Sequence, residues 1–238
     1  MLQIHAWLQE QERQGVKATF LCNWRLTERV HLERRVSVYV SPHSGAPVAY
    51  QWGGLLKDGI LEVRHAERGR GIGRVMVEHM LAEAELADEP ILFVHCAPES
   101  SAPFWQRMGF TLLPEHRGET YGYCIVPKQL PPPAAGKPVQ VDVEFYSERR
   151  GWDADIPPLQ VNAQSAVRDS NGSVWLSHRV SWFDTIPTFE GDSYAIVKVD
   201  GENWYSGKLK RERASILGFK ACANGYHLDR LFPVTSPA

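Results

Sequence analysis

The chain has 238 residues, which is enough for one large domain or two small ones with a buried core. Its residues are 43% hydrophobic and 23% charged, as in an ordinary globular protein. The formal net charge of −2 gives no bulk electrostatic argument for binding to nucleic acid or to a membrane surface.

The cysteines and the first residues indicate the cellular compartment in which the protein is expected to function. Cys22, Cys96, Cys124 and Cys222 lie far apart, and no pair has C-x-x-C spacing. We therefore expect no metal site and no disulfide framework. The chain begins without a basic segment followed by an apolar stretch, and no apolar run is long enough to span a bilayer. These features predict a cytoplasmic protein.

In the first part of the chain, apolar residues recur with both helical and strand periods, which predicts a mixed α/β domain. We expect helices over residues 4–14, 26–34, 72–87 and 101–108. We expect strands over residues 36–40, 47–52, 60–64, 91–94, 110–113 and 121–126. The buried face of the third helix is predicted to contain Ile72, Met76, Met80 and Ala84, with Val75 beside them.

A proline-rich segment marks the clearest boundary. Consecutive prolines favour an extended linker, so residues 131–138 are predicted to separate a domain over 1–130 from a smaller one over 139–238. The second domain is predicted to be β-rich, because residues 139–145 alternate with period two and turn signals occur at 169–173 and 200–201. Three indoles are expected in its core: Trp175, Trp182 and Trp204.

A short basic cluster in the second domain contains Lys208, Lys210, Arg211 and Arg213. Basic residues next to aromatic ones can hold nucleic acid, but Glu212 interrupts the cluster and the domain is not strongly basic. A nucleic-acid partner is therefore not expected. The domain could select the acceptor substrate, mediate a homodimer or cover the active site, and the sequence does not choose among these roles.

A glycine-rich turn between a predicted strand and a predicted helix is the most informative segment. Glycines allow positive φ and let a ligand approach the backbone closely. The first helical N–H groups have no intrahelical partner and favour a phosphate or pyrophosphate. Arginines at 68, 70 and 74 add positive charge at the same place.

Two known anion-binding motifs do not fit this turn. A Walker A loop needs Gly-Lys-Ser/Thr, which is absent. A dinucleotide fingerprint counted from Gly69 needs a glycine where Arg74 stands, and it usually belongs to an opening βαβ unit. The pattern that remains is Arg-x-x-Gly-x-Gly, which Arg68, Gly71 and Gly73 satisfy.

This segment resembles the acetyl-CoA motif of the GCN5-related N-acetyltransferase family. A later segment, residues 103–110, resembles a second family motif, in which an aromatic pair precedes Gly-Phe. The resemblance covers roughly residues 30–127. It implies a mostly antiparallel mixed sheet flanked by helices, with acetyl-CoA as the co-substrate and an amine on a small molecule or a protein as the acceptor.

The resemblance also implies which residues bind the cofactor. The strand residues Leu61 and Val63 would offer backbone groups to the pantetheine arm, and the amides of the turn would hold the pyrophosphate. The cofactor-binding residues implied in this way are Leu61, Val63, Arg68, Gly69, Arg70, Gly71, Ile72, Gly73, Arg74 and Phe104.

The catalytic positions depart from the family pattern. Many members have a tyrosine acid where this chain has Trp105, and an asparagine where it has Pro98. Indole has no useful acidity. A glutamate that some members use as a base corresponds to Lys57, with Asp58 adjacent. We therefore take Asp58 as the expected base and Tyr121 as the expected acid.

Further acid–base candidates each have an ordinary structural interpretation: Glu62, His95, Glu99 and Tyr123. The first hypothesis is transfer of an acetyl group to an amine in a ternary complex. The second is a degenerate domain that binds acyl-CoA without turnover while the second domain acts in recognition. The third is an enzyme that uses a longer acyl group or another nucleophile.

Overall fold

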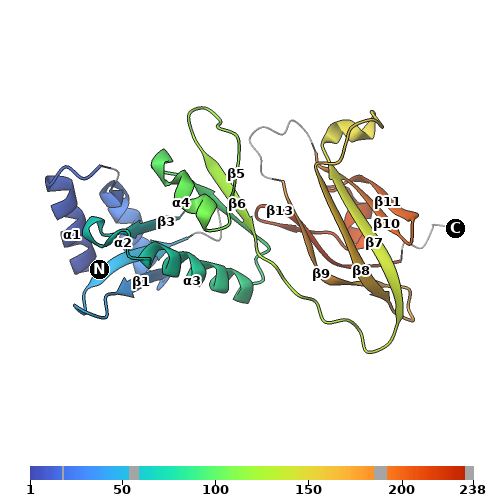
Figure 1. Cartoon of the computed structure of the whole chain (residues 1–238), viewed down its shortest axis with the longest axis horizontal. Helices are drawn as coiled ribbons and strands as arrows, with labels where there is room; N and C mark the ends of the chain where they lie inside the picture. The colour runs from blue at the N-terminus through green and yellow to red at the C-terminus, as the bar shows by residue number, and fades with distance from the viewer. Residues whose placement is uncertain (18, 54–58, 185–191, 234–238) are drawn as a thin grey trace. The chain divides into compact units, whose positions relative to one another are not determined.

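The computed structural model describes residues 1–17, 19–53, 59–184 and 192–233, and its fold is mixed α/β (Figure 1). The chain divides into two compact units, residues 1–126 and residues 127–238. Each unit is described by itself. Within the described residues, no helix combines the length and apolar character needed to cross a bilayer.

The first unit contains the helices and strands predicted from periodicity, in the predicted order, with ends shifted by a few residues. Its described α-helices are α1 (Leu2–Arg13), α2 (Trp24–Leu32), α3 (Ile72–Leu86) and α4 (Ala102–Arg107). Its described strands are β1 (Val36–Val40), β2 (Pro47–Trp52), β3 (Ile60–Val63), β4 (Ile91–His95), β5 (Thr111–Leu112) and β6 (Tyr121–Ile125). Short 3-10 helices are η1 (Phe20–Asn23), η2 (His65–Glu67) and η3 (Glu99–Ser101).

The described strands of the first unit pair in the antiparallel manner that was expected, and they divide into two sheets. In the described residues, one antiparallel sheet has the order β1-β2-β3 and the other has the order β4-β6-β5. Among the described strands, β3 and β4 are both at a sheet edge, and no ladder joins them. The division into two sheets was not predicted, because periodicity identifies strands but not the point where a sheet separates.

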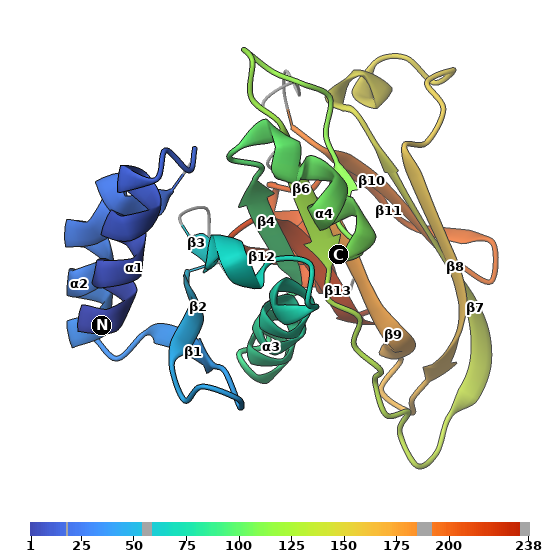
Figure 2. The ribbon, with the colours of Figure 1, turned by 60° about the vertical axis from the view of Figure 1, so that its left-hand side comes forward.

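Helices cover both faces of the β1-β2-β3 sheet (Figure 2). α1 and α2 pack on one face, where Trp7 and Trp24 join Tyr50 and Ile60 in one apolar cluster. α3 packs on the opposite face. The residues in contact there include Val63 of β3 and, from α3, Ile72 and Met76.

α3 also packs against β4. Val77 and Met80 of α3 cluster with Leu92 and Val94 of β4, together with residues of α4. The predicted buried face of α3 needs one correction, because Val75 is 44% exposed and Val77 is buried in its place. A helix turns about 100° per residue, so residue 77 shares the side of residues 80 and 84, whereas residue 75 points away from both.

The second unit is β-rich, as predicted. Its described strands are β7 (Lys137–Tyr146), β8 (Gln160–Arg168), β9 (Val174–Phe183), β10 (Tyr194–Val199), β11 (Glu202–Lys208), β12 (Lys220–Cys222) and β13 (Gly225–Leu231). They form one antiparallel sheet with the order β11-β10-β7-β8-β9-β13-β12. A 3-10 helix, η4 (Glu148–Gly151), and a short helix, α5 (Glu212–Leu217), complete the unit.

The core of the second unit contains one of the three predicted tryptophans. Trp182 stacks on Phe145 with ring centroids 4.9 Å apart. Trp204 packs at the margin of this core. Trp175 lies outside it, where its indole donates to Asp169 at 2.8 Å and lies beneath the guanidinium of Arg230.

The segment before the prolines belongs to the second unit. The N–H of Leu130 donates to the carbonyl of Ser177 at 3.0 Å, and the N–H of Arg179 donates to the carbonyl of Lys128 at 2.9 Å. Gln129 forms an isolated bridge with His178. Residues 127–130 thus follow β9 beyond the part of that strand that pairs with β8.

Candidate functional site

The turn before α3 presents backbone N–H groups that have no partner in the described parts of the chain. Gly69 and Gly71 have φ of +79° and +83°, a conformation that favours glycine. Gly71 is the N-cap of α3 and provides no side-chain cap. None of the described residues accepts a hydrogen bond from the backbone N–H of residues 69–74. These donors and the positive end of the helix dipole form a site suited to an anion.

The backbone of β3 also presents hydrogen-bonding groups at an open edge. The N–H of Arg64 donates to Val48 of β2 at 2.8 Å, and antiparallel pairing alternates along the strand. The backbone groups of Glu62 therefore point toward β2, and those of Leu61 and Val63 point toward the open edge. One of these groups has a partner, because Nε of Arg68 donates to the carbonyl of Val63 at 3.1 Å.

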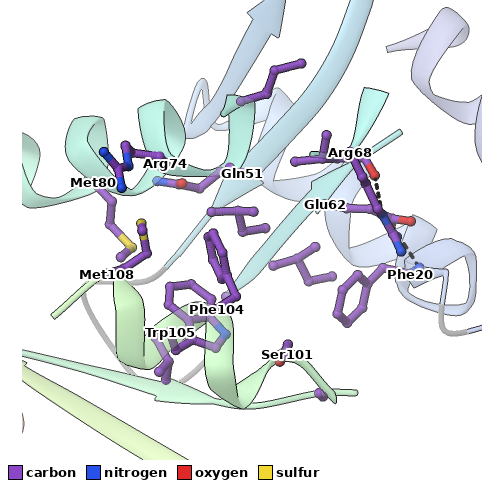
Figure 3. Close-up of a pocket in the computed structure, with 18 of the residues that line it drawn as sticks. Phe20, Gln51, Glu62, Arg68, Arg74, Met80, Ser101, Phe104, Trp105 and Met108 are labelled. Atoms are coloured by element: carbon purple, nitrogen blue, oxygen red, sulfur yellow. Dashed lines mark hydrogen bonds between the residues drawn. The ribbon is translucent and has the colours of Figure 1, made fainter. Parts of the chain in front are cut away.

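A cavity of about 640 Å³ lies between β3, β4, the glycine turn and α4 (Figure 3). Its volume is within the usual range for small-molecule and cofactor sites. The lining includes every residue of β3 and three consecutive residues of β4, Phe93 to His95. Neighbouring residues of a strand point to opposite faces. The cavity therefore extends around the open strand edges and reaches both faces of the sheets.

The lining residues thus lie on two faces, and we call the part of this one cavity on each face a chamber. The α3-side chamber lies on the face where α3 and α4 pack, and its lining includes Leu61, Val63, Gly71, Arg74, Val94 and Phe104. The α1-side chamber lies on the opposite face, where α1 and α2 pack, and its lining includes Phe20, Trp52, Ile60, Glu62, Phe93 and His95.

Glu62 is a buried carboxylate in the wall of the α1-side chamber, with only 2% of its surface exposed. Its Oε2 accepts the backbone N–H of Phe20 at 3.0 Å and the hydroxyl of Tyr50 at 3.3 Å. Burial raises the pKa of Glu62, while the Phe20 N–H and the nearby positive charge of Arg68 partly offset this increase. A carboxyl group with a raised pKa inside a cavity is a candidate for proton transfer.

The predicted cofactor-binding residues all line the cavity except Arg70. Arg70 forms an exposed ion pair with Glu67 at 2.9 Å. Arg68 reaches back to β3 instead of extending from the turn (Figure 3). Gly73 packs against the ring of Phe104, so a glycine at this position lets α3 and α4 approach closely.

Neither of the two expected catalytic residues is among the described residues that line the cavity. Asp58 lies outside the described residues. Tyr121 is not among the residues that line the cavity, and its hydroxyl donates to the carboxylate of Glu119. This hydrogen bond raises the pKa of Tyr121. The Tyr121 ring stacks on His95 and on Phe93, with centroids 4.8 and 5.4 Å apart, so it supports two residues that do line the cavity.

Several lining residues were not singled out from the sequence. Phe20 and Trp52 come from η1 and β2, and no local motif identifies them. Gln51 is buried and lines the cavity, and its Oε1 accepts no hydrogen bond from the part of the chain that the structure describes. Ser101 also lines the cavity, and its hydroxyl is buried without a partner among those residues.

The basic cluster of the second unit is partly neutralised. Lys208 forms ion pairs with Glu148 and with Asp192, and Lys210 also pairs with Asp192. The neighbouring Tyr205 is buried and donates its hydroxyl to the carbonyl of Lys208 at 2.7 Å. These contacts reduce the free positive charge and the exposed aromatic surface of the cluster.

A scan against models of known protein families and a search of curated proteins found no match to this chain.

Proposed function

We propose that the first unit binds acetyl-CoA and transfers its acetyl group to an amine, as the resemblance to GCN5-related N-acetyltransferases implies. One observation carries the proposal: a single cavity joins the unpartnered N–H groups before α3 to the open edge of β3. The first feature suits a pyrophosphate and the second suits an extended, amide-containing arm. Coenzyme A contains both groups, one after the other.

The donor would occupy the α3-side chamber. Its pyrophosphate would accept hydrogen bonds from the amides of residues 69–74, with Arg74 adding charge from the cavity wall. Its pantetheine arm would follow the edge formed by Leu61 and Val63. The thioester would then lie at the gap between β3 and β4, where the two chambers meet.

The reaction needs no covalent enzyme intermediate. The amine nitrogen attacks the thioester carbonyl carbon, a C–N bond forms, and the C–S bond breaks to release the thiolate of coenzyme A. Backbone N–H groups at the edge of β3 are donors for the developing oxyanion. Holding both substrates in one cavity provides much of the acceleration.

Glu62 is the group we assign to take the proton from the amine. It lies in the chamber opposite the donor, and its raised pKa makes it a better proton acceptor than an exposed carboxylate. The leaving thiolate takes a proton from solvent or from a hydroxyl group. Among the described lining residues, the side chains that carry a hydroxyl are Ser100 and Ser101.

Calorimetry with acetyl-CoA, combined with thiol release in the presence of amines, tests this proposal. We expect binding, release that depends on the amine, and a loss of about 100-fold in kcat for Glu62→Gln with an unchanged Kd for acetyl-CoA. A folded protein that does not bind acetyl-CoA would contradict the proposal.

The alternative is a degenerate module that binds acyl-CoA without turnover. It is favoured by one observation, namely that Trp105 occupies the position of the usual tyrosine acid and no tyrosine is found among the described residues that line the cavity. Binding of acetyl-CoA without thiol release for any amine would support this alternative.

A further inference from the structure

We infer that the acceptor is a single primary amine attached by a short chain to an aromatic or other apolar group, and that it binds in the α1-side chamber. This inference rests on the transferase function proposed above and names the substrate class of the same site. It follows from the position, the walls and the charge of that chamber.

The position of the chamber follows from where the donor can bind. The unpartnered N–H groups of residues 69–74 and the guanidinium of Arg74 lie with α3, so the phosphates of the donor belong on that side. A thioester at the gap between β3 and β4 is then open to attack from the opposite face. That face is the α1-side chamber, and the nucleophile has to enter from there.

The walls of this chamber are mainly apolar and aromatic. Phe20, Trp52, Ile60 and Phe93 line it, and the last three are at least nine-tenths buried. The indole N–H of Trp52 already donates to Thr27 at 3.0 Å, so it offers nothing to a ligand. These walls suit an apolar body better than a sugar or a peptide backbone, because the polar groups of such ligands would lose their hydrogen bonds to water.

The charge of the chamber fits one amine rather than several. Glu62 is the carboxylate among its described lining residues, and Arg68 lies close enough to lower the pKa of that carboxyl group. The other lining carboxylate, Glu67, is at the glycine turn and pairs with Arg70. A polyamine would bring several positive charges to a chamber whose described lining holds a single, partly balanced negative charge.

A panel of acceptors measured with the full chain and acetyl-CoA tests the inference. The panel contains 2-phenylethylamine, butylamine, spermidine, Nα-acetyl-lysine and 2-phenylethanol. We expect kcat/KM for 2-phenylethylamine to exceed that for butylamine, spermidine and the lysine derivative by about tenfold, equivalent to about 1.4 kcal/mol. The alcohol is expected to give no thiol release, because Glu62 is placed to deprotonate an ammonium group.

Two matched substitutions link this preference to the chamber. Phe20→Ala removes an aromatic wall but keeps the backbone N–H that Glu62 accepts. It should raise KM for 2-phenylethylamine about tenfold, with little change for butylamine or in the Kd of acetyl-CoA. Phe232→Ala is the control, because it truncates a partly exposed phenylalanine of the second unit. It should change none of these values.

The outcomes separate this inference from the proposed function. Suppose that the protein binds acetyl-CoA but acetylates spermidine or the lysine derivative faster than 2-phenylethylamine. The transferase function would then be supported, and the inferred acceptor class would be contradicted. Equal effects of Phe20→Ala on 2-phenylethylamine and butylamine would also overturn it. If folded protein failed to bind acetyl-CoA, the proposed function itself would fail. Binding without turnover of any amine would overturn both the transferase and its acceptor.

Discussion

Gly73 of α3 and Phe104 of α4 are in direct contact. A β-carbon on Gly73 would lie 3.1 Å from Cε2 and 3.2 Å from Cζ of the Phe104 ring. Gly73 lies in the helix with an ordinary backbone conformation, so it is the space beside it, and not its φ, that requires glycine. The ring of Phe104 forms part of the α3-side chamber, and this contact fixes how far α4 stands from the glycine turn.

Gly73→Ala should therefore destabilise the protein by about 1 kcal/mol. Overpacking typically costs about 1–3 kcal/mol, whereas alanine gains about 1 kcal/mol of helix propensity over glycine. In a Phe104→Leu background the same substitution should be neutral or stabilising. Urea denaturation of the four proteins in this cycle measures the coupling, and a stabilising Gly73→Ala in the parent chain would show that the ring moves freely.

Gly71→Asp and Gly71→Asn form a matched pair that tests the phosphate site. Both side chains tolerate positive φ, both can cap a helix, and no described atom lies within 4 Å of a β-carbon at Gly71. They are nearly equal in size and shape and differ in charge and in the amide N–H donors of asparagine. Aspartate should raise the Kd of acetyl-CoA at least about tenfold over asparagine. Two negative charges about 4 Å apart, here the carboxylate and the pyrophosphate, repel by about 1–4 kcal/mol. Calorimetry at two salt concentrations should show the difference shrinking as salt rises.

Arg74→Gln and Arg70→Gln should have different effects on acetyl-CoA binding. Arg74 lines the cavity, whereas Arg70 does not line it and pairs with Glu67 in solvent. We expect Arg74→Gln to weaken binding by about three- to tenfold, less than a fully buried charged hydrogen bond would give, because Arg74 is exposed. Arg70→Gln should change binding less than about twofold. Equal effects of the two substitutions would contradict our proposal that the phosphates of acetyl-CoA bind in the cavity beside Arg74.

Glu62→Gln should stabilise the protein at neutral pH. Burial raises the folded-state pKa of Glu62 above the ordinary value of 4.5. At a pH between the ordinary pKa and the raised folded-state pKa, the folded state keeps a proton that the unfolded state has released. The free energy of unfolding therefore falls as pH rises through this window, by up to about 1.4 kcal/mol per pH unit. Glutamine accepts the same hydrogen bonds and does not titrate.

Thermal unfolding of the parent and Glu62→Gln from pH 4 to pH 8 measures this difference. The melting temperatures should be similar at pH 4, and the variant should melt higher at pH 8. A variant that is less stable than the parent at pH 8 would mean that the ionised carboxylate stabilises the fold. That result would contradict the expectation that ionisation of the buried Glu62 destabilises it.

Cys96 should resist alkylation, whereas Cys22 should react. Burial raises the pKa of Cys96 to about 11, and Cys22 is exposed. At pH 8 only about one thousandth of the Cys96 thiols would be ionised, and the thiolate is the reactive form. Mass spectrometry after iodoacetamide treatment measures both sites. Comparable labelling at Cys96 would reveal local opening of the core beside β4.

The elements of the first unit were largely predictable, because local patterns determine them. The glycine turn, the four-residue recurrence in α3 and the apolar run of β4 all predict elements that the structure contains. The separation between β3 and β4 could not be predicted in this way. It depends on how α3 packs against both strands at once, and no local pattern in either strand shows this.

The candidate site was predictable only in the α3-side chamber, which contains the glycine-turn motif. Leu61, Val63 and the turn residues other than Arg70 line the cavity. The other chamber is assembled from η1, β2, β3 and β4, so no spacing in the sequence reveals it. Glu62 illustrates the difficulty, because an alternating strand gives an exposed and a buried glutamate the same pattern, and only the packing of α1 and η1 buries it.

The pairing of residues 127–130 with β9 affects where the chain can be cut. The prolines suggest a cut after residue 130, but that cut would remove the backbone groups bonded to Ser177 and Arg179. A fragment that begins at residue 139 would leave the backbone groups of residues 177–179 in β9 without the partners that residues 128–130 provide. Unpaired strand edges promote aggregation. A fragment that begins at residue 127 would retain this protective segment, so the natural division of the molecule lies just after Val126.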